Sequence, residues 1–451
     1  MPSRCPIFLS IAYLYCCLPI FRHQQEADLN KIELHSIIYV NKNVLYISYD
    51  GLSDPLGQSQ ILPYLSGLAG YGYDITILSC EKRKSFKTEG PRIMKELTQK
   101  KIKWVYLFYR KYPPILSTLL TKFLLKKKAY SLHKQVHFSI THCRSYIASL
   151  VGLEMKKKFN TKFIFDMRGF WADERAEGHV WNLANPLYKY IYSYFKKKEV
   201  DFFSRADYVI ALTNTAENII HSCSDVLNQP IRVEVIPCCA DLNHFSRNKI
   251  VAENLLTLKT SLGIQKNDFI LSYLGSLGTW YCLEEMLLFF KRLIMVKPYA
   301  KFLFITPDNH NKINDAARRL NIPSGCVMVK KASYQDVPDL ISLSNISIFF
   351  IRPTFSKKAS SPTKMAEVLG LGIPIICNSG IGDIDAHLKD GLCGMAVDSF
   401  TDANYDRVIK DLDSLMKVSR ETITSFAQST FSLEEGIKKY HFIYSALFLD
   451  K

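Results

Sequence analysis

The feature that most constrains the fold of this 451-residue chain is a β-α-β unit within residues 43–79. The apolar run "NVLYISYD" (43–50) has the pattern of a buried strand, and "SQILPYLSGLAGYG" (59–72) has helical spacing and terminal glycines. "YDITILS" (73–79) is then a second strand. Strands that alternate with helices in this way indicate a parallel sheet with helices on both of its faces.

The alternation continues along the chain and restarts after residues 233–245. Further strands are predicted at 103–107, 137–141, 162–166, 207–211, 268–274, 301–305, 326–330, 346–351, 373–377 and 393–397. We therefore predict an α/β protein with two Rossmann-like domains, as its length also suggests. The predicted parts are an extension at 1–42, domains at 43–235 and 236–430, and a C-terminal helix at 431–451. Ligands of such sheets bind at the carboxyl ends of the strands, so both domains are expected to face one central cleft.

Neither series of strands carries the G-x-G-x-x-G pattern of dinucleotide-binding proteins, and no phosphate-binding P-loop is present. The second strand, "DITILS" (74–79), is also interpreted as lacking an acidic residue at its end. These absences argue against a dinucleotide-dependent oxidoreductase.

The first forty residues contain the 16-residue apolar run "PIFLSIAYLYCCLPIF" between Arg4 and Arg22. The run is shorter than the roughly 20 residues of a membrane-spanning helix, and Pro19 interrupts it. An interfacial anchor and a mis-assigned start are both compatible with it. An export signal ranks below them, because no small-x-small cleavage site follows.

The formal net charge is +16, and most of the surplus lies in the first half of the chain. Residues 82–134 are the densest basic part, with lysines interleaved with aromatic residues and leucines. This mixture suits an anionic membrane surface, and a solvated helix face is an equal alternative. No nucleic-acid-binding motif accompanies the charge, so nucleic acid is not an expected partner.

The twelve cysteines have no C-x-x-C spacing and form no cluster with histidines that is typical of a metal site. Scattered cysteines in a chain of this size indicate buried thiols in a reducing compartment. No metal ligands are predicted.

The stretch "KASSPTKMAEVLGLGIPIICNSGIGD" (358–383) follows a predicted strand and opens a short helix. Ser361 is predicted to be its N-cap and Pro362 its first residue. The free amides of a helix N-terminus, with Lys364 in the first turn, suit a phosphate. Glu367 lies one turn deeper and can accept two hydrogen bonds from a ribose diol. The structural alternative is a capped helix with an exposed Lys/Glu pair.

Other strand-to-helix loops carry polar residues and glycines. Gly380 and Gly382 in "NSGIGD" (378–383) allow close approach of a ligand, and Asp383 is expected to cap the next helix. In the first domain, the loop "DGLSDPLGQ" (50–58) offers Asp54, Gly57 and Gln58 to sugar hydroxyls.

The segment "FIFDMRGFWADERAEG" (163–178) ends an apolar strand with Asp166 and Arg168, followed by Trp171. Charges at a strand end that faces the cleft favour a function, although a turn cap with its ion-pair partner is an alternative. His142 in "THCRSY" (141–146) is a further cleft candidate, and a lone histidine is more often structural.

Together these segments resemble the glycosyltransferase family four group of GT-B enzymes from residue 43 to the C-terminus. The resemblance is carried by "YISYDGLSDPLGQSQILPYLSGLA", "FDMRGFWADER", "YLGSLGTWY" and "SSPTKMAEVLGLGIPIICNSGIGD". It implies a GT-B fold with a nucleotide-sugar donor on the C-terminal domain and an acceptor on the N-terminal domain. It also implies sugar transfer with retention at the anomeric carbon and no essential metal or cofactor.

The chain departs from the family pattern at two contacts. Glu367 matches the second of two glutamates that many members have, but Ala359 occupies the position of the first. Gly275 is followed by Ser276 where many members have arginine, and Thr279 and Trp280 lie where a lysine is common. The candidates for the missing cation are Arg352, Lys357, Lys358 and Arg168.

The expected roles follow from the resemblance and from the residues. The catalytic candidates are Asp166, Arg168 and Lys364. The donor-binding candidates are Gly275, Ser276, Arg352, Ser361, Thr363, Glu367, Gly380 and Gly382. The acceptor or cleft candidates are Asp54, Gly57, Gln58, His142 and Trp171.

The resemblance and the charge distribution together imply a place and a pathway. We expect a UDP- or GDP-linked donor and a glycan or lipid-linked saccharide acceptor in surface polysaccharide synthesis. The expected location is cytoplasmic, peripheral on the inner face of the membrane. The rival hypotheses are a sugar-nucleotide 2-epimerase on the same scaffold, a degenerate homologue without turnover, and a basic membrane or nucleic-acid binding module.

Overall fold

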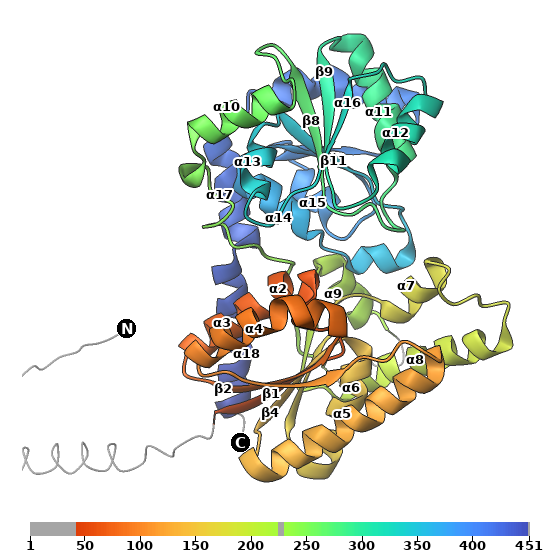
Figure 1. Ribbon diagram of the computed structural model, residues 1–451. Coiled ribbons are helices and arrows are strands. Elements are labelled where there is room, and N and C mark those ends of the chain that lie inside the picture. Colours follow the sequence, from red (N-terminus) through yellow and green to blue (C-terminus); the bar gives the residue numbers. More distant parts are fainter. Residues whose placement is uncertain (1–41, 224–229, 450–451) are drawn as a thin grey trace, which may run out of the picture. The chain divides into compact units, whose positions relative to one another are not determined.

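The computed structural model describes residues 42–223 and 230–449 of the chain (Figure 1). The hypotheses on the apolar N-terminal run therefore fall outside the described residues. Among the residues described, no helix combines the length and the apolar character needed to cross a membrane.

The first sheet has seven described strands, all parallel, in the order β3-β2-β1-β4-β5-β6-β7. They are β1 (Asn43–Ser48), β2 (Asp74–Glu81), β3 (Lys103–Phe108), β4 (Ile140–Arg144), β5 (Lys162–Asp166), β6 (Tyr208–Ala211) and β7 (Val233–Val235). The central strands β1 and β4 are buried along almost their whole length, as expected where helices cover both faces.

Helices connect these strands. They are α2 (Pro55–Gln60), α3 (Leu62–Gly70), α4 (Arg83–Gln99), α5 (Pro114–Val136), α6 (Ser145–Phe159), α7 (Trp171–Glu177), α8 (Pro186–Arg205) and α9 (Asn214–His221).

The second sheet has six described parallel strands in the order β10-β9-β8-β11-β12-β13. They are β8 (Phe269–Leu274), β9 (Ala300–Ile305), β10 (Val327–Lys330), β11 (Ile346–Phe349), β12 (Ile375–Asn378) and β13 (Gly394–Val397). The α-helices that follow the first sheet are α10 (Ala252–Ser261), α11 (Leu283–Val296), α12 (His310–Arg319), α13 (Val337–Ser342), α14 (Thr363–Gly370), α15 (Ile384–Leu388), α16 (Asp402–Leu415) and α17 (Arg420–Phe431). The short helices η2 (Arg247–Lys249) and η3 (Phe355–Ala359) are of the 3-10 type.

The fold prediction of two Rossmann-like α/β domains is confirmed, because each sheet is parallel and helix-covered. The domain boundaries themselves stay a prediction. The last helix, α18 (Leu433–Leu449), packs against α3 beside the first sheet (Figure 1). Its side chains Tyr440 and Tyr444 are buried in the core of the first half, so the C-terminal segment completes that core.

The strand order places one topological switch point in each sheet. The chain moves outward from β1 to β2 and β3 and then returns to β4 on the other side of β1. In the second sheet the corresponding change of direction lies between β8 and β11. Ligands of open α/β sheets bind outside the carboxyl ends of the strands at these points. The loops after β1, β4, β8 and β11 are therefore the places to look for a site.

The exclusion of a dinucleotide-dependent oxidoreductase rested partly on the predicted end of the second strand, and that predicted end is wrong. Strand β2 runs two residues further than predicted and does end in an acidic residue, Glu81. The Glu81 carboxylate is buried and accepts hydrogen bonds from the amides of Leu52 and Ser53 at 2.7 and 3.1 Å. The hydroxyls of Ser53 and Ser79 donate to the same carboxylate. Glu81 therefore holds the loop after β1 in place. The argument against a dinucleotide-dependent oxidoreductase now rests on the absence of G-x-G-x-x-G alone.

Two other differences concern the first sheet. Strand β4 begins at Ile140 and not at residue 137, because His137 has a left-handed backbone and ends the preceding helix. His142 consequently lies inside a strand and not in a loop. Strand β7 was not predicted, since three partly buried residues give too short a pattern.

Gly57 is closely surrounded by backbone atoms of the first strand-to-helix loop. A Cβ atom there would lie 2.2 Å from the carbonyl oxygen of Gly51 and 2.6 Å from the Cα of Leu52. Because backbone atoms cannot give way cheaply, Gly57→Ala is expected to lower the free energy of unfolding by about 2 kcal/mol. The control is Gly70→Ala at the end of α3, where a Cβ atom meets nothing within 4 Å. Urea unfolding followed by tryptophan fluorescence compares the two, and equal effects would contradict the packing argument.

Candidate active site

Helix α14 begins one residue later than the sequence suggested. Pro362 occupies the N-cap position, and the first helical residue is Thr363. The Ser361 hydroxyl instead accepts a hydrogen bond from the amide of Cys238 at 3.1 Å. The prediction that Ser361 caps this helix is therefore wrong. The Ser361 hydroxyl thus bonds to a residue distant in sequence. This hydrogen bond connects the start of α14 to Cys238, in the segment that follows β7.

Lys364 lies in the first turn of α14 with its ammonium group buried among aromatic rings. Its Nζ donates to the Tyr273 hydroxyl at 3.0 Å and lies 3.5 Å from the ring centroid of Tyr281. Burial lowers the pKa of Lys364 well below its usual range, against the opposing effects of Glu367 and Asp308. No carboxylate of the described residues lies within ion-pair distance of this amine. A buried amine that lacks a direct counter-ion is suited to an anionic ligand.

Glu367 lies one turn further along α14 and is partly exposed. Within the described part of the chain its carboxylate has no hydrogen-bond or ion-pair partner. Burial raises the pKa of Glu367 from 4.5 to about 7, although Lys364 lowers it. An acidic side chain with unused acceptor oxygens and a perturbed pKa is a recognised mark of a binding or catalytic site.

The raised pKa of Glu367 has a consequence for stability. Folded protein holds a proton on Glu367 between about pH 4.5 and pH 7 that the unfolded chain has lost. The stability of the wild type relative to Glu367→Gln therefore falls as the pH rises through this window and levels off above it. Thermal unfolding of both proteins without ligand, between about pH 5 and pH 8, measures the difference. A difference that does not change with pH would show that Glu367 titrates normally.

Gly275 and Ser276 follow β8 at the switch point of the second sheet. Gly275 has a φ of 101°, and a Cβ atom there would lie 3.4 Å from the Lys364 Nζ. This glycine therefore lets the backbone pass close to the amine. The Ser276 hydroxyl donates to Asp308 at 3.0 Å, and the Leu277 amide donates to the same carboxylate at 2.6 Å. Ser276 thus supports the loop and does not supply the cation that family members have there.

Two of the candidate replacement cations, Lys357 and Arg352, are engaged with other groups of the protein. The Lys357 ammonium lies 3.8 Å from the ring centroid of Trp280 and 2.8 Å from Glu174. The Arg352 guanidinium lies 4.8 Å from the centroid of the same ring and donates to the carbonyl of Glu177 at 3.1 Å. Lys358 is exposed and lies 5.9 Å from the ring centroid of Phe355. Arg168 is held by Asp166, Gln60 and Cys238 close to the start of α14, so Arg168 and Lys358 are the two candidates that stay open.

A groove of about 440 Å³ lies beside the loop after β8. Its lining includes Thr279, Tyr281, Glu284, Lys312, Arg319 and Arg352. Arg319 and Glu284 pair across it at 3.1 Å. Lys364 and Glu367 do not line this groove, although Tyr281 both lines it and contacts the Lys364 ammonium. Because its lining includes Lys312, Arg319 and Arg352, the groove is an alternative position for a phosphate.

The two glycines of residues 378–383 differ in their surroundings: a Cβ atom at Gly382 would lie 2.2 Å from the carbonyl oxygen of Ser360, whereas one at Gly380 would meet only Pro353, at 3.7 Å. The Gly382 amide donates to the carbonyl of Lys357 at 2.9 Å, and the Gly380 amide donates to Asp385 at 2.9 Å. Asp383 does not cap the helix that follows it, so that prediction is wrong. Its carboxylate instead accepts from the amides of Asn214 and Thr215, at 2.7 and 2.9 Å, at the start of α9. The loop therefore contacts the helix that follows β6.

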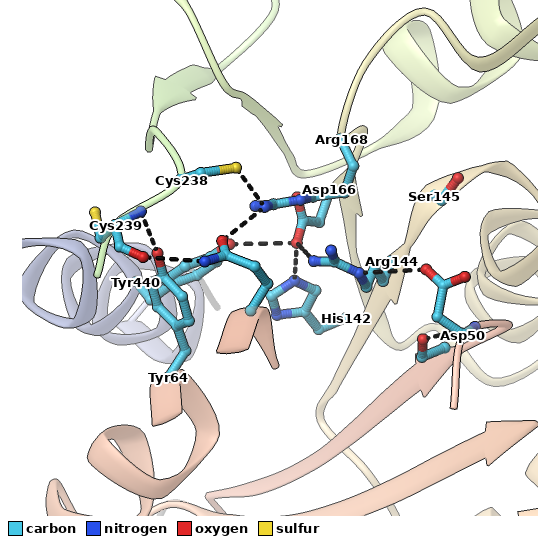
Figure 2. Close-up of polar contacts among 12 residues, drawn as sticks. Asp50, Tyr64, His142, Arg144, Ser145, Asp166, Arg168, Cys238, Cys239 and Tyr440 are labelled. Carbon is cyan, nitrogen blue, oxygen red and sulfur yellow. Dashed lines mark hydrogen bonds and ion pairs between the residues drawn. The ribbon is translucent and has the colours of Figure 1, made fainter. Parts of the chain in front are cut away.

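Asp166 ends strand β5 and is buried at the centre of a charged cluster (Figure 2). One oxygen lies 3.8 Å from Arg168; the other lies 3.9 Å from Arg144 and 3.6 Å from His142. The Tyr440 hydroxyl of α18 donates to it at 3.2 Å. Burial alone would raise the pKa of Asp166, but Arg168, His142 and Arg144 outweigh it and hold the pKa below its usual range. Asp166 is therefore an ionised anchor for its neighbours.

Arg168 lies in the turn after β5 and connects this cluster to α14. Its φ of 58° is in the left-handed region, which non-glycine residues adopt mainly where the surrounding structure imposes it. Its guanidinium donates to Gln60 at 3.2 Å and to the Cys238 sulfur at 3.3 Å, as Figure 2 shows for Cys238. Because the Cys238 amide donates to Ser361, Cys238 connects the turn after β5 to the start of α14.

The remaining acceptor candidates have partners in the elements around the first sheet. Asp54 pairs with Lys82 at 2.9 Å, and Gln58 accepts from Arg92. Trp171 stacks on Tyr146 and belongs to the aromatic packing of that half. His142 lies in the Asp166 cluster, where the Tyr444 hydroxyl contacts its Nδ1 at 2.8 Å. Of these predicted cleft residues, only His142 lies close to the charged cluster.

Several residues around Asp166 and Glu367 were not predicted from the sequence, among them Arg144 and Tyr334. Arg144 ends β4 opposite Asp166 and approaches Asp50 at 3.6 Å. Its position two residues after His142 in "THCRSY" was the available signal. Tyr334 lies after β10 with its ring stacked on His244 at 4.4 Å, and burial, with a smaller contribution from Glu367, raises its pKa. Only a contact between distant segments reveals that aromatic pair.

The described residues also bear on metals and disulfides. Residues 42–223 and 230–449 contain no group of three or more His, Cys, Asp or Glu side chains that could hold a metal ion. The nine cysteines within these ranges are free, and six of them are buried. Buried thiols were expected from the spacing.

Comparisons with known proteins agree with this architecture. Residues 61–244 match the family described as Glycosyltransferase Family 4. No match was found among curated proteins. The sucrose-phosphate synthase of Thermosynechococcus elongatus is similar in structure, with 14% identity, a TM-score of 0.67, and 91% of this chain and 100% of that chain covered.

Two further solved structures have the same fold. HepE from Anabaena, described in complex with UDP and glucose, matches at 12% identity and a TM-score of 0.62, covering 89% of this chain and 99% of its own. A putative UDP-N-acetylglucosamine 2-epimerase from Listeria monocytogenes matches at 10% identity and a TM-score of 0.55, with coverage of 91% and 98%. These comparisons confirm the GT-B fold and, over residues 61–244, the resemblance to family four.

Proposed function

We propose that this chain, a GT-B protein that matches glycosyltransferase family four over residues 61–244, is a retaining glycosyltransferase. It moves a sugar from a nucleoside diphosphate donor to a glycan or a lipid-linked saccharide. The observation that carries the proposal is that Lys364 and Glu367 lie one turn apart on α14. A buried amine without a direct counter-ion lies one turn from a carboxylate without a hydrogen-bond partner in the described residues. Diphosphate and ribose diol are the two groups that this pair complements.

The proposed roles follow from charge. Lys364 and the first amides of α14 neutralise the leaving diphosphate, as helix N-termini do for phosphates. Glu367 accepts from the ribose hydroxyls. Arg168 supplies a second positive charge, which replaces the missing family arginine at Ser276. Electrostatic stabilisation of developing charge is usually the largest catalytic contribution, so these cations carry most of the proposed rate enhancement. No metal is required by this scheme.

Asp166 receives a positioning role in this proposal. Because its carboxylate is buried under Tyr440, an acceptor hydroxyl does not reach it in this arrangement. Its charge instead holds Arg168 and Arg144 in place. In the retaining reaction the departing phosphate itself takes the proton of the acceptor hydroxyl, so no further general base is assigned.

UDP is the first donor nucleotide to test, followed by GDP. HepE, which has the same fold, is described with UDP and glucose bound, and for this reason we would test UDP before GDP. For the pathway we propose surface polysaccharide synthesis, at a peripheral position on the cytoplasmic face of the membrane. The basic first half, where the family places its acceptor, supports this position.

A homologue without turnover is the second candidate. Ala359 is fully buried and Ser276 is bound to Asp308, so two family contacts with the donor are absent. A sugar-nucleotide 2-epimerase is the third, because the fold is common to both activities.

Product analysis separates the three functions. The protein is incubated with labelled nucleotide sugars, with and without lipid-linked saccharides extracted from membranes. A transferase releases UDP or GDP and labels the extract only when acceptor is present. An epimerase changes the sugar of the donor without acceptor. Binding of donor without either product would support the degenerate homologue and refute the transferase.

A further inference from the structure

The first half of helix α5 (Pro114–Val136) has the reverse of the usual polarity. Its buried positions carry Ser117 and Thr121. Its exposed positions carry Leu116, Leu119, Leu120 and Phe123, with exposed fractions of 65%, 59%, 40% and 57%. These four residues have the i, i+3, i+4, i+7 spacing of a single stripe. In a surface helix whose outer side meets only water, an apolar stripe of this kind normally faces the protein core.

The second half of α5 has the ordinary arrangement. Leu125, Ala129 and Leu132 are buried, and Lys127 and Lys128 are exposed. The inversion is therefore confined to the first half of the helix, and the lysines follow directly after the apolar stripe. Hydrophobic contact and positive charge thus lie side by side on one element.

Helix α8 (Pro186–Arg205) continues this surface. Leu187, Tyr190 and Tyr194 are exposed along one side of it. Helix α6 packs against both α5 and α8, and Figure 1 shows the three beside the same sheet. Glu154 of α6 pairs with Lys122 and Lys126 of α5 at 2.5 and 2.6 Å. The exposed side chains of α5 and α8 thus belong to two helices that both pack on α6, and together we call them the α5–α8 surface.

Cations without ion-pair partners surround the apolar residues. Within the described part of the chain these exposed side chains are Arg110, Lys111, Lys127, Lys128, Lys189 and Lys197. Tyrosines such as Tyr112 and Tyr190 lie among them, and tyrosine concentrates where membranes meet water. Interfaces between proteins are instead depleted in lysine at their centres. Charge complementarity thus favours anionic phospholipid as the occupant.

We infer that the α5–α8 surface binds an anionic lipid bilayer, with Leu116, Leu119, Leu120 and Phe123 inserted among the headgroups and the surrounding cations on lipid phosphates. The inference rests on the membrane part of the proposed function and does not depend on the transfer reaction. It assigns a definite surface to that partner.

Co-sedimentation with vesicles tests the inference on the full chain. The vesicles contain phosphatidylcholine with or without phosphatidylserine, at low and high salt. Wild-type protein is expected to bind the anionic vesicles and to lose much of this binding at high salt. The double substitution Leu119→Glu with Phe123→Glu is expected to weaken binding at least about tenfold, because it removes insertion and adds repulsion. Both residues are exposed, so folding is expected to be kept.

Matched controls use exposed residues beside the second sheet. Leu256→Glu with Val296→Glu changes two similarly exposed apolar residues and is expected to leave binding unchanged. Lys127→Gln with Lys128→Gln is expected to reduce binding at low salt, whereas Lys266→Gln with Lys410→Gln is not. UDP titration on the same preparations reports on the donor site separately. Loss of vesicle binding with intact UDP binding supports the surface assigned here.

Three outcomes would overturn the inference. Wild-type protein does not bind anionic vesicles at low salt. The α5 variant binds them as tightly as the α10 and α11 control. Alternatively, the α5 substitutions abolish concentration-dependent self-association and leave vesicle binding intact, which would make the surface a contact between two copies of the chain.

Discussion

Replacing Glu367 with alanine is expected to weaken nucleoside diphosphate binding about 100-fold, without loss of the fold. Two hydrogen bonds from ribose hydroxyls to a carboxylate contribute roughly 3 kcal/mol or more together, which corresponds to that factor. The wild-type carboxylate has no hydrogen-bond or ion-pair partner in the described residues, so its removal leaves no group of the protein unpaired. Calorimetric titration with UDP or GDP gives the affinities.

Two variants sharpen this test. Glu367→Gln keeps the size of the side chain and one acceptor oxygen, so its affinity is expected to lie between those of the wild type and Glu367→Ala. Glu421→Ala removes an exposed carboxylate from α17, which packs against α14, and is expected to bind like the wild type. Equal affinity of wild type and Glu367→Ala would exclude Glu367 from the nucleotide site.

The largest expected loss of stability comes from Asp166→Ala. Asp166 is the shared partner of Arg144, Arg168 and His142, and removing it leaves two buried guanidinium groups without that carboxylate. Breaking a buried ion pair on one side typically costs about 3–5 kcal/mol. We expect a loss of this size in the free energy of unfolding, measured by urea denaturation, together with loss of activity because Arg168 is no longer held.

Asp207 provides the matched control for Asp166. It lies just before β6 of the same sheet and pairs with Lys156 at 2.7 Å, but both side chains are partly exposed. Asp207→Ala is therefore expected to cost much less, about 1 kcal/mol. Asp166→Asn keeps the shape and part of the hydrogen bonding and is expected to fall between the two alanine variants. If Asp166→Ala were no less stable than Asp207→Ala, the charged cluster would not be a structural anchor.

The fold could be predicted from the sequence because its signals are local. A run such as "KFIFD" has the β-branched and aromatic residues of a buried strand, and β5 spans Lys162–Asp166 as predicted. The end of β2 was missed because Glu81 is a charged residue inside a buried segment. Its burial depends on amides of Leu52 and Ser53, almost thirty residues earlier in the chain. Nothing in the sequence near Glu81 reveals those partners.

The candidate site was predictable only in part for the same reason. Lys364 and Glu367 share one helix, so their spacing alone brings them together. Ser361 and Asp383 were assigned to their own helices, and the structure instead pairs them with Cys238 and with the start of α9. A cap assignment assumes the nearest partner, and contacts between segments distant in sequence defeat that assumption.

A crystal structure of the protein with UDP would test the assigned donor site directly. We expect the diphosphate beside the Lys364 ammonium and the first turn of α14, with the ribose hydroxyls within hydrogen-bond distance of Glu367. UDP bound instead in the groove lined by Lys312, Arg319 and Arg352 would contradict the assigned donor site, since Lys364 and Glu367 would then have no part in holding the nucleotide.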